Sequence, residues 1–273
     1  MKCSALALLL FFAKVNQAQT WAGEQLLSGT ADSWEPFIAA DPNSSRVYAV
    51  WFNPYGPAPC NGCPQSTIQF STSTDGGVSW SSPIWFASQY TSQSQYDPTI
   101  KVVPGTGVLY MTWMEWNQIM FSQSKDYGTT WSKPVKVSGS QWADHPWFGM
   151  SANGKDIYVF WSKGDVYGVA SHDYGLNWSS PVKVNTDKNR QYYAEGVEVL
   201  SDGTVILAAC SYPCSKGTSQ CKGVINITVF RSTNMGSTFN QSIVDQVYTG
   251  PQWMTNTLET VASDLSGNLM LLY

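Results

Sequence analysis

Carboxyl side chains stand at matching places along this 273-residue chain, each at the start of an apolar stretch. They are Glu35, Asp97, Asp144, Glu195 and Glu259. Two carboxyls brought to one site can serve as general acid and as base or nucleophile, the pairing that glycoside hydrolysis uses. We take Glu195 and Asp144 as the candidate catalytic pair. Glu35 and Asp97 are expected to contact ligand at the same site, although capping of the strand is the alternative for Asp97.

Aromatic and basic side chains near these acids extend the candidate site. The aromatic residues are Trp34, Trp142, Trp147, Tyr192 and Tyr193. Their ring faces could stack on sugar rings, and burial between sheets is the alternative for each of them. Among the three arginines, only Arg190 stands in a segment that leads into a candidate strand of the site. We therefore expect Trp147, Tyr192, Tyr193 and Arg190 to contact substrate.

The elements that must position these residues follow from an internal repeat. The pattern Ser-X-Asp-X-Gly-X-X-Trp occurs at Ser73–Trp80, Ser124–Trp131 and Ser171–Trp178, with a degenerate copy at Ser232–Phe239. Its acidic position is filled by Asp75, Asp126, Asp173 and Asn234. A short polar side chain can accept hydrogen bonds from backbone N–H groups across a turn, and glycine allows positive φ there. The repeat therefore predicts four hairpins of the same kind.

Each hairpin belongs to a longer unit of about 50 residues. Apolar second strands are predicted at 47–51, 109–113, 157–161, 205–209 and 269–273, and short fourth strands at 134–137 and 181–184. Four antiparallel strands in each unit are typical of a propeller blade. In that architecture the first strands line a central channel, so the acids at their starts would gather at one end of it.

The repeated pattern resembles the Asp box of sialidases and related β-propellers. That resemblance implies an all-β, six-bladed propeller over residues 20–273. Trp21–Thr30 matches the outer strand of a last blade, while the chain stops inside its fifth unit. We therefore expect a carboxy-terminally truncated propeller with about four and a half blades.

The catalytic residues of sialidases are matched only in part. These enzymes bind the substrate carboxylate with three arginines and use a tyrosine nucleophile with a glutamate partner. Glu195 matches that glutamate, but Glu35 and Cys210 stand where two of the arginines belong, and no Asp follows the first blade's second strand. The resemblance thus implies a glycan-directed glycoside hydrolase, without support for the usual sialidase mechanism. The alternative is a non-catalytic extracellular propeller that binds glycans or proteins.

The amino terminus indicates secretion. Residues 1–19 contain Lys2, then an apolar run, then small residues at the expected cleavage site, which is the pattern of a cleaved signal peptide. The sequons at Asn43, Asn177, Asn226 and Asn240 fit a secreted glycoprotein. Five cysteines follow the signal peptide: Cys60, Cys63, Cys210, Cys214 and Cys221. Loop disulfides such as Cys60–Cys63 and Cys214–Cys221 are one use of them, and a free thiol remains.

Composition excludes several classes of function. Asp, Glu, Lys and Arg make up only 12% of the chain, with 15 basic and 19 acidic residues, so the basic surface needed for nucleic acid is missing. Aromatic residues reach 14%, which favours strands and turns over helices. No segment after the signal peptide is long and apolar enough to cross a membrane. The cysteine spacings do not favour zinc, and we expect no metal or cofactor. The sequence does not indicate an oligomeric state.

Overall fold

The computed structural model describes residues 25–28, 33–54, 66–86, 93–139, 142–213, 223–249, 261–264 and 267–271. These residues form strands and turns, with no helix among them, so the expected all-β class is confirmed. Within those ranges, no helical segment could span a lipid bilayer. The predicted signal peptide, the greater part of 21–30, Glu259, and the cysteines 60, 63, 214 and 221 lie outside the described residues.

Four antiparallel sheets of four strands follow one another along the chain, and each keeps its strands in sequence order. The first contains β1 (Trp34–Ala40), β2 (Val47–Asn53), β3 (Thr67–Ser73) and β4 (Ile84–Trp85). The second contains β5 (Gln95–Val102), β6 (Leu109–Glu115), β7 (Gln118–Ser124) and β8 (Val135–Lys136).

The third sheet contains β9 (Asp144–Met150), β10 (Ile157–Ser162), β11 (Val166–Ser171) and β12 (Val182–Lys183). The fourth contains β13 (Gln191–Val199), β14 (Val205–Tyr212), β15 (Gly223–Ser232) and β16 (Asn240–Thr249). A two-stranded sheet of β17 (Val261–Ser263) and β18 (Leu269–Leu271) follows. Each predicted second and fourth strand overlaps a strand of these sheets, with ends that differ by up to three residues within the described residues.

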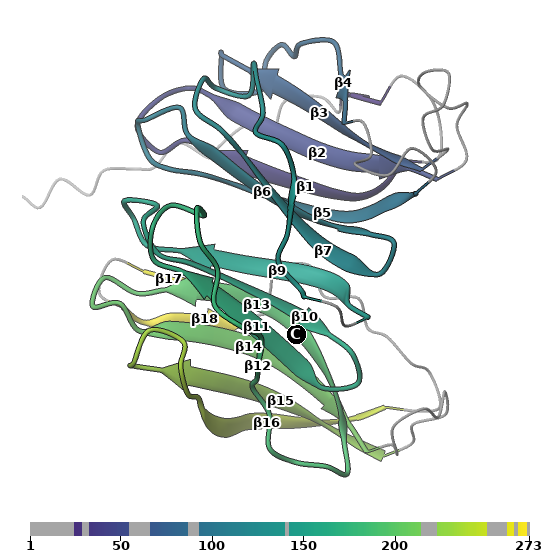
Figure 1. Cartoon of the computed structure of the whole chain (residues 1–273), viewed down its shortest axis with the longest axis vertical. Helices are drawn as coiled ribbons and strands as arrows, with labels where there is room; N and C mark the ends of the chain where they lie inside the picture. The colour runs from purple at the N-terminus through teal and green to yellow at the C-terminus, as the bar shows by residue number, and fades with distance from the viewer. Residues whose placement is uncertain are drawn as a thin grey trace, which may run out of the picture.

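The sheets pack side by side through their first strands, as Figure 1 shows from the purple to the yellow end of the chain. Strand β1 contacts β5, β5 contacts β9, β9 contacts β13, and β13 contacts β17. We call these five the inner strands. Buried aromatic and aliphatic side chains fill the space between successive sheets, with Trp113 and Trp161 among the largest fully buried ones. This packing brings the starts of the inner strands to one end of the molecule.

Each predicted Asp box forms the expected hairpin turn between the third and fourth strands. In the second sheet, Asp126 Oδ1 accepts hydrogen bonds from Ser124 Oγ at 2.8 Å and from the Thr130 backbone N–H at 2.8 Å. Its Oδ2 accepts one from Thr130 Oγ1 at 2.6 Å. The next two residues, Tyr127 and Gly128, have φ values of 62° and 87°. Two successive positive φ angles reverse the chain tightly, and the box side chains hold that reversal.

The boxes also join each sheet to the one before it. The Trp131 ring lies 4.9 Å from Phe86 and 5.5 Å from Phe70, both in the preceding sheet. Trp178 meets Phe121 at 5.0 Å in the same way. A Cβ on Gly128 would lie 2.4 Å from the Phe70 ring, so only glycine fits this close approach. The repeat therefore fixes the spacing between sheets as well as the local turn.

The fourth box provides a natural comparison for a substitution test. Asn234 Oδ1 accepts the same backbone bond, from Thr238 N–H at 3.0 Å, and Asn234 Nδ2 donates to Thr238 Oγ1 at 2.8 Å. We expect Asp126→Asn to leave the melting temperature almost unchanged, and Asp126→Ala to lower it by several degrees because the turn loses its acceptors. Thermal denaturation of both variants checks this. Equal melting temperatures for Asp126→Ala and wild type would contradict the role assigned to the box.

Candidate functional site

Four of the inner strands, β1, β5, β9 and β13, share an irregularity within their first five residues. In β1, Trp34 pairs with Phe52 and Phe37 with Val50, so β1 carries one residue more than β2 across this interval. Equivalent bulges occur in β5, β9 and β13. The residues placed at these bulges are Glu35, Asp97, His145 and Glu195. We call them the bulge residues.

Three of the bulge residues have a strained backbone. The φ angles are 48° at Glu35, 52° at Asp97 and 54° at His145, and each residue precedes a proline. A residue before proline normally adopts an extended conformation with negative φ. Positive φ at non-glycine residues is unfavourable and is found disproportionately at functional sites. The same strained turn in three sheets aims one polar side chain per sheet at a shared location.

The structure corrects the expected register of the third sheet. Asp144 pairs with Ser162 one step before the bulge, so it corresponds to Trp34 of the first sheet and not to Glu35. His145 occupies the place that was expected for Asp144. His172, by contrast, pairs with Asp156 at 2.8 Å and lies on the turn side of its sheet.

Glu35, Asp97 and His145 form one connected polar cluster across three sheets. Glu35 Oε2 accepts a hydrogen bond from the Asp97 backbone N–H at 3.1 Å. His145 Nδ1 lies 3.8 Å from Asp97 Oδ1, where the Asp97 side chain is 10% exposed and the imidazole 39% exposed. The carboxyl groups of Glu35 and Asp97 also interact directly. Charged groups so close together and so poorly hydrated must balance one another.

The cluster balances its charge by holding protons. Burial, together with the hydrogen bond and negative charge of Asp97, raises the pKa of Glu35 to about 8. Burial alone would raise the pKa of Asp97, but the neighbouring His145 and Glu35 side chains lower it. Burial would lower the pKa of His145, yet Asp97, Glu35 and Glu195 outweigh that effect and raise it to about 9. At neutral pH the cluster thus contains a neutral Glu35, an ionised Asp97 and a positive His145.

Asp144 and Glu195, the candidate catalytic pair, flank this cluster. Burial and the negative charge of Asp97 raise the pKa of Asp144 above its ordinary value. Glu195 is buried with 8% of its surface exposed, close enough to His145 and Cys210 to raise the pKa of both. The phenol of Tyr193 has its pKa raised by burial and by Asp144. Asp144, Tyr193 and Glu195 therefore belong to the same electrostatic environment.

The cluster also has the donor set of a divalent cation site. Glu35, Asp97 and His145 each offer one ligand atom, and the three atoms lie within 4.8 Å of one another. The same residues and their following prolines line a small cavity of about 30 Å³, roughly the space of one water molecule. Metal binding would have to displace the protons on Glu35 and His145. The internal proton and the imidazolium already satisfy Asp97 without an ion.

Three residues that were predicted to contact ligand are buried in the core or hydrogen-bonded to backbone. Trp147 and Tyr192 are buried in the core between the third and fourth sheets, so neither ring offers a free face to a sugar. Arg190 donates to Ser211 Oγ at 2.9 Å and to the carbonyl oxygens of Ser211 and Val224 at 2.6 Å each. Arg190 therefore ties the ends of β14 and β15 together. Burial of the two rings and the backbone hydrogen bonds of Arg190 therefore correct the prediction that these three residues contact substrate.

The other two arginines also lie away from the cluster. The guanidinium of Arg46 stacks over the Tyr127 ring at 4.1 Å, in the turn after β1. Arg231 lies on β15, paired with Ile206 of β14 at the far end of the strands from Glu195. No arginine triad is therefore assembled, since the chain has only these three arginines. Cys210 is a free thiol buried on β14, and burial raises its pKa to about 12, which makes it unreactive.

Exposed indoles lie near the starts of β1, β5 and β9, and sequence analysis found only two of the three. Trp34 and Trp142 are exposed, next to Glu35 and close to Asp144 respectively. Trp116 is 65% exposed in the two-residue turn between β6 and β7. Nothing in the sequence distinguished Trp116 from the other 12 tryptophans, because only the pairing of β6 with β5 places this turn near Asp97.

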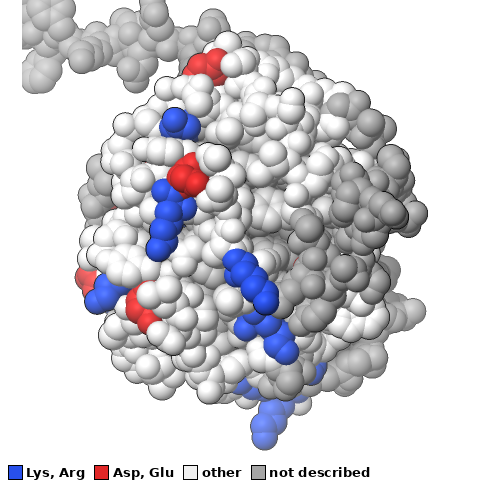
Figure 2. Space-filling view, turned by 45° about the horizontal axis from the view of Figure 1, so that its top comes forward, with Lys and Arg blue, Asp and Glu red and all other residues white. Residues whose placement is uncertain are grey.

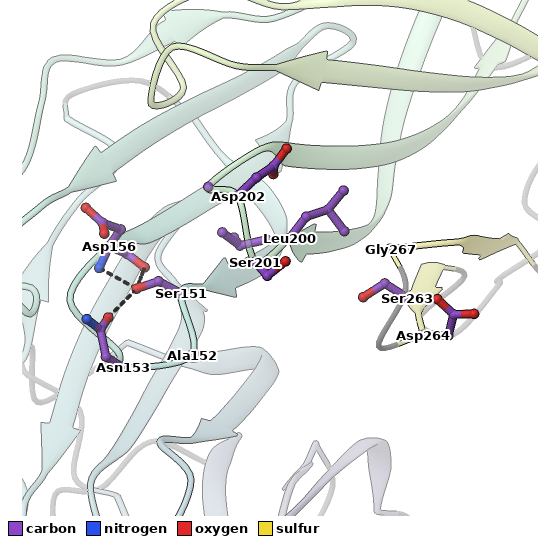
Figure 3. A pocket seen from close by; sticks show the side chains of 12 residues that line it. Ser151, Ala152, Asn153, Asp156, Leu200, Ser201, Asp202, Ser263, Asp264 and Gly267 are labelled. Carbon is purple, nitrogen blue, oxygen red and sulfur yellow. Dashed lines mark hydrogen bonds between the residues drawn. The ribbon is translucent and has the colours of Figure 1, made fainter.

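A larger hollow of about 640 Å³ lies at the opposite end of the inner strands. Figure 3 shows the side chains that line it. It is formed by the turns that follow β9, β13 and β17. Its carboxylates mostly hold those turns: Asp202 accepts the Thr204 N–H at 2.8 Å, and Asp264 accepts the Asn268 N–H at 2.8 Å. Among the described residues, the face in Figure 2 is mostly uncharged and carries few acidic and basic side chains. The bulge end is therefore the best candidate site.

Comparisons with known proteins support the fold alone. No family model matches the chain, and no curated protein matches it in sequence. A protein of unknown function from Dyadobacter fermentans superposes with a TM-score of 0.59 at 14% identity, covering 78% of this chain and 69% of that one.

Two structurally similar enzymes act on glycans. The GH93 α-L-arabinofuranosidase of Fusarium graminearum, in complex with arabinobiose, has a TM-score of 0.57 at 13% identity over 83% of this chain and 73% of that chain. The leech intramolecular trans-sialidase has a TM-score of 0.55 at 12% identity, over 85% of this chain and 53% of that chain. The chain thus has the all-β architecture of propeller-type glycoside hydrolases.

The charge balance of the cluster predicts how stability depends on pH. A group with a raised pKa in the folded state stabilises the fold fully below its unfolded pKa and loses that contribution as pH rises through the folded value. This applies to Glu35 between 4.5 and about 8, and to His145 between 6.5 and about 9. We therefore expect the melting temperature to fall as pH rises from about 5 to about 9.

In Glu35→Gln this decline should be smaller below about pH 8, because Gln resembles the protonated carboxyl and cannot release a proton. Glu198→Gln, on the same strand as Glu195 but beyond the bulge, is the control and should follow wild type. Thermal denaturation across the pH range measures both. Superimposable curves for wild type and Glu35→Gln would show that Glu35 carries no proton in the folded cluster.

Proposed function

We propose that this protein is a glycan-acting enzyme of the glycoside hydrolase type, with its active site at the bulge end of the inner strands. The observation that carries the proposal is the separation of carboxyl pKa values at one location. The pKa values of Glu35 and Asp144 are raised, while the pKa of Asp97 beside them is lowered. Environments that push neighbouring carboxyls apart in this way are how acid and base roles are divided in hydrolases.

Asp144 is the proposed general acid and Glu195 the proposed base or nucleophile. Asp144 is half-buried at the very start of β9, and its raised pKa favours the protonated form that an acid must have. Glu195 lies on the neighbouring inner strand β13, near the His145 imidazolium. Glu35 and Asp97 interact too closely to admit a sugar between them, so we assign them to positioning His145 and to holding charge.

The substrate class follows from the positions of the cations. All three arginines are committed to stacking or strand positions away from the cluster, so a carboxylate-bearing sugar would meet acids instead of a cationic clamp. Neutral sugars fit better, because carboxyls and exposed indoles suit hydroxyl groups and apolar ring faces. The structurally similar arabinofuranosidase, in complex with arabinobiose, supports this choice by fold. Secretion through the predicted signal peptide would place the enzyme among extracellular glycans.

A non-catalytic glycan- or protein-binding propeller is the second candidate. The burial of Glu195 and Asp97 favours it, because a reacting carboxylate must reach the substrate. Under this alternative the cluster would only shape and charge the floor of a binding site. Catalysis and simple binding differ in whether removal of one carboxylate abolishes turnover.

The deciding experiment measures turnover by the secreted full-length protein. Aryl α-L-arabinofuranosides, other neutral aryl glycosides and a fluorogenic sialoside are incubated with wild type, Glu195→Gln and Asp144→Asn. We expect turnover of a neutral glycoside, and a loss of about 100-fold or more in kcat/KM in each variant. Glu198→Gln serves as the matched control and should retain full activity.

Asp144→Asn should lose least with substrates whose leaving group needs no protonation, such as dinitrophenyl glycosides, because the general acid is then dispensable. Equal losses with good and poor leaving groups would contradict the role of Asp144. Glycan binding without turnover, unchanged in Glu195→Gln, would favour the non-catalytic alternative. Turnover of the sialoside alone would overturn the assignment to neutral sugars.

A further inference from the structure

The turn between β6 and β7 presents a large apolar side chain to solvent at a strained position. Trp116 has φ 49° and the following Asn117 has φ 55°, in the two-residue connection between Glu115 and Gln118. Asparagine tolerates such angles, but they are unfavourable for tryptophan. The Trp116 indole is 65% exposed all the same. Both the backbone strain and the exposure cost stability, so packing within the chain does not account for this residue.

The turn is anchored rigidly beneath Trp116. Glu115 is completely buried, and its Oε2 accepts hydrogen bonds from Gln95 Nε2 at 3.0 Å and from Trp113 Nε1 at 3.2 Å. Gln95 in turn accepts the Ile68 backbone N–H from the first sheet at 3.1 Å. A buried, fully bonded network therefore holds the base of the turn in one orientation. The backbone that carries the exposed indole is therefore held in place.

A second exposed indole, that of Trp142, lies on the segment next to this turn. The Ala143 N–H donates to the Asn117 carbonyl at 2.9 Å, which joins the β6–β7 turn to the segment that leads into β9. Trp142, 46% exposed, and Trp116 each lie one residue from this bond. The segment continues directly into Asp144, the proposed general acid. Two indoles thus border the candidate site on the side of that acid.

We infer that Trp116 and Trp142 form an aromatic platform that binds a further sugar unit of a neutral oligosaccharide, beside the unit held at Asp144 and Glu195. This inference rests on the proposed function and names its substrate class as chains of sugars, not single units. An indole offers an apolar face to the C–H surface of a sugar ring and an N–H to its hydroxyls. A rigid platform binds with little loss of conformational entropy.

Binding of trisaccharides tests the platform. The protein is prepared as Glu195→Gln, which prevents turnover, and titrated calorimetrically with arabinotriose, xylotriose and cellotriose. Adding Trp116→Asn should weaken the affinity for the trisaccharide that binds by about fivefold to tenfold. Trp85→Ala is the matched control: Trp85 is 43% exposed but lies on the outer strand β4, so its removal should leave the affinity unchanged. Equal weakening in both variants, or no weakening in Trp116→Asn, would overturn the platform.

A second measurement separates binding from folding. Asparagine suits the positive φ of position 116, so Trp116→Asn should match or exceed the wild-type melting temperature. A melting temperature several degrees lower would show that Trp116 is structural and would overturn the inference.

The outcomes also distinguish the platform from the hydrolase. Trp116-dependent binding in a protein that turns over no glycoside would reject the hydrolase and keep the platform. If aryl glycosides are turned over but trisaccharide affinity does not change in Trp116→Asn, the hydrolase is kept and the platform is rejected. Failure of all three trisaccharides to bind would overturn the platform for neutral chains.

Discussion

One extra residue in the first part of each of the strands β1, β5, β9 and β13 determines what this protein presents at one end. The bulge breaks the alternation of the strand, and in three sheets it holds a polar residue at positive φ before a proline. Because the sheets pack through these same strands, the bulges lie at one level and their side chains meet.

Bringing four ionisable groups together in this way requires that their charges be balanced and their lost hydration be offset. Glu35 and Asp97 repel each other when both are ionised, and water is largely excluded from Asp97. A proton retained on Glu35 and a positive His145 relieve that repulsion. Burial and the negative charge of Asp97 still raise the pKa of Asp144 at the edge of the cluster, although His145 opposes them. The cluster therefore leaves beside it a carboxyl that holds its proton more strongly than an ordinary aspartate does.

The Asp boxes act at the opposite side of each sheet, far from this chemistry. Their hydrogen bonds form a tight turn, and their aromatic residues and glycines pack on the preceding sheet, as Trp131 and Gly128 do on Phe70. They set the distance and angle between neighbouring sheets. The inner strands can therefore carry strained residues, because the sheets are held in place from their outer edges.

Sequence alone determined the all-β class, the repeated four-stranded unit, the Asp boxes and the gathering of acids at the inner strands. These features follow from local patterns: alternating apolar residues, turn residues at constant spacing, and a recurring polar motif. Tertiary structure placed His145, not Asp144, at the third bulge, a register that the proline after each of Glu35, Asp97 and His145 also marks in the sequence. It likewise buried Trp147 and Tyr192 and exposed Trp116. Burial depends on which sheet packs against which, and no pattern within a single strand records its neighbour.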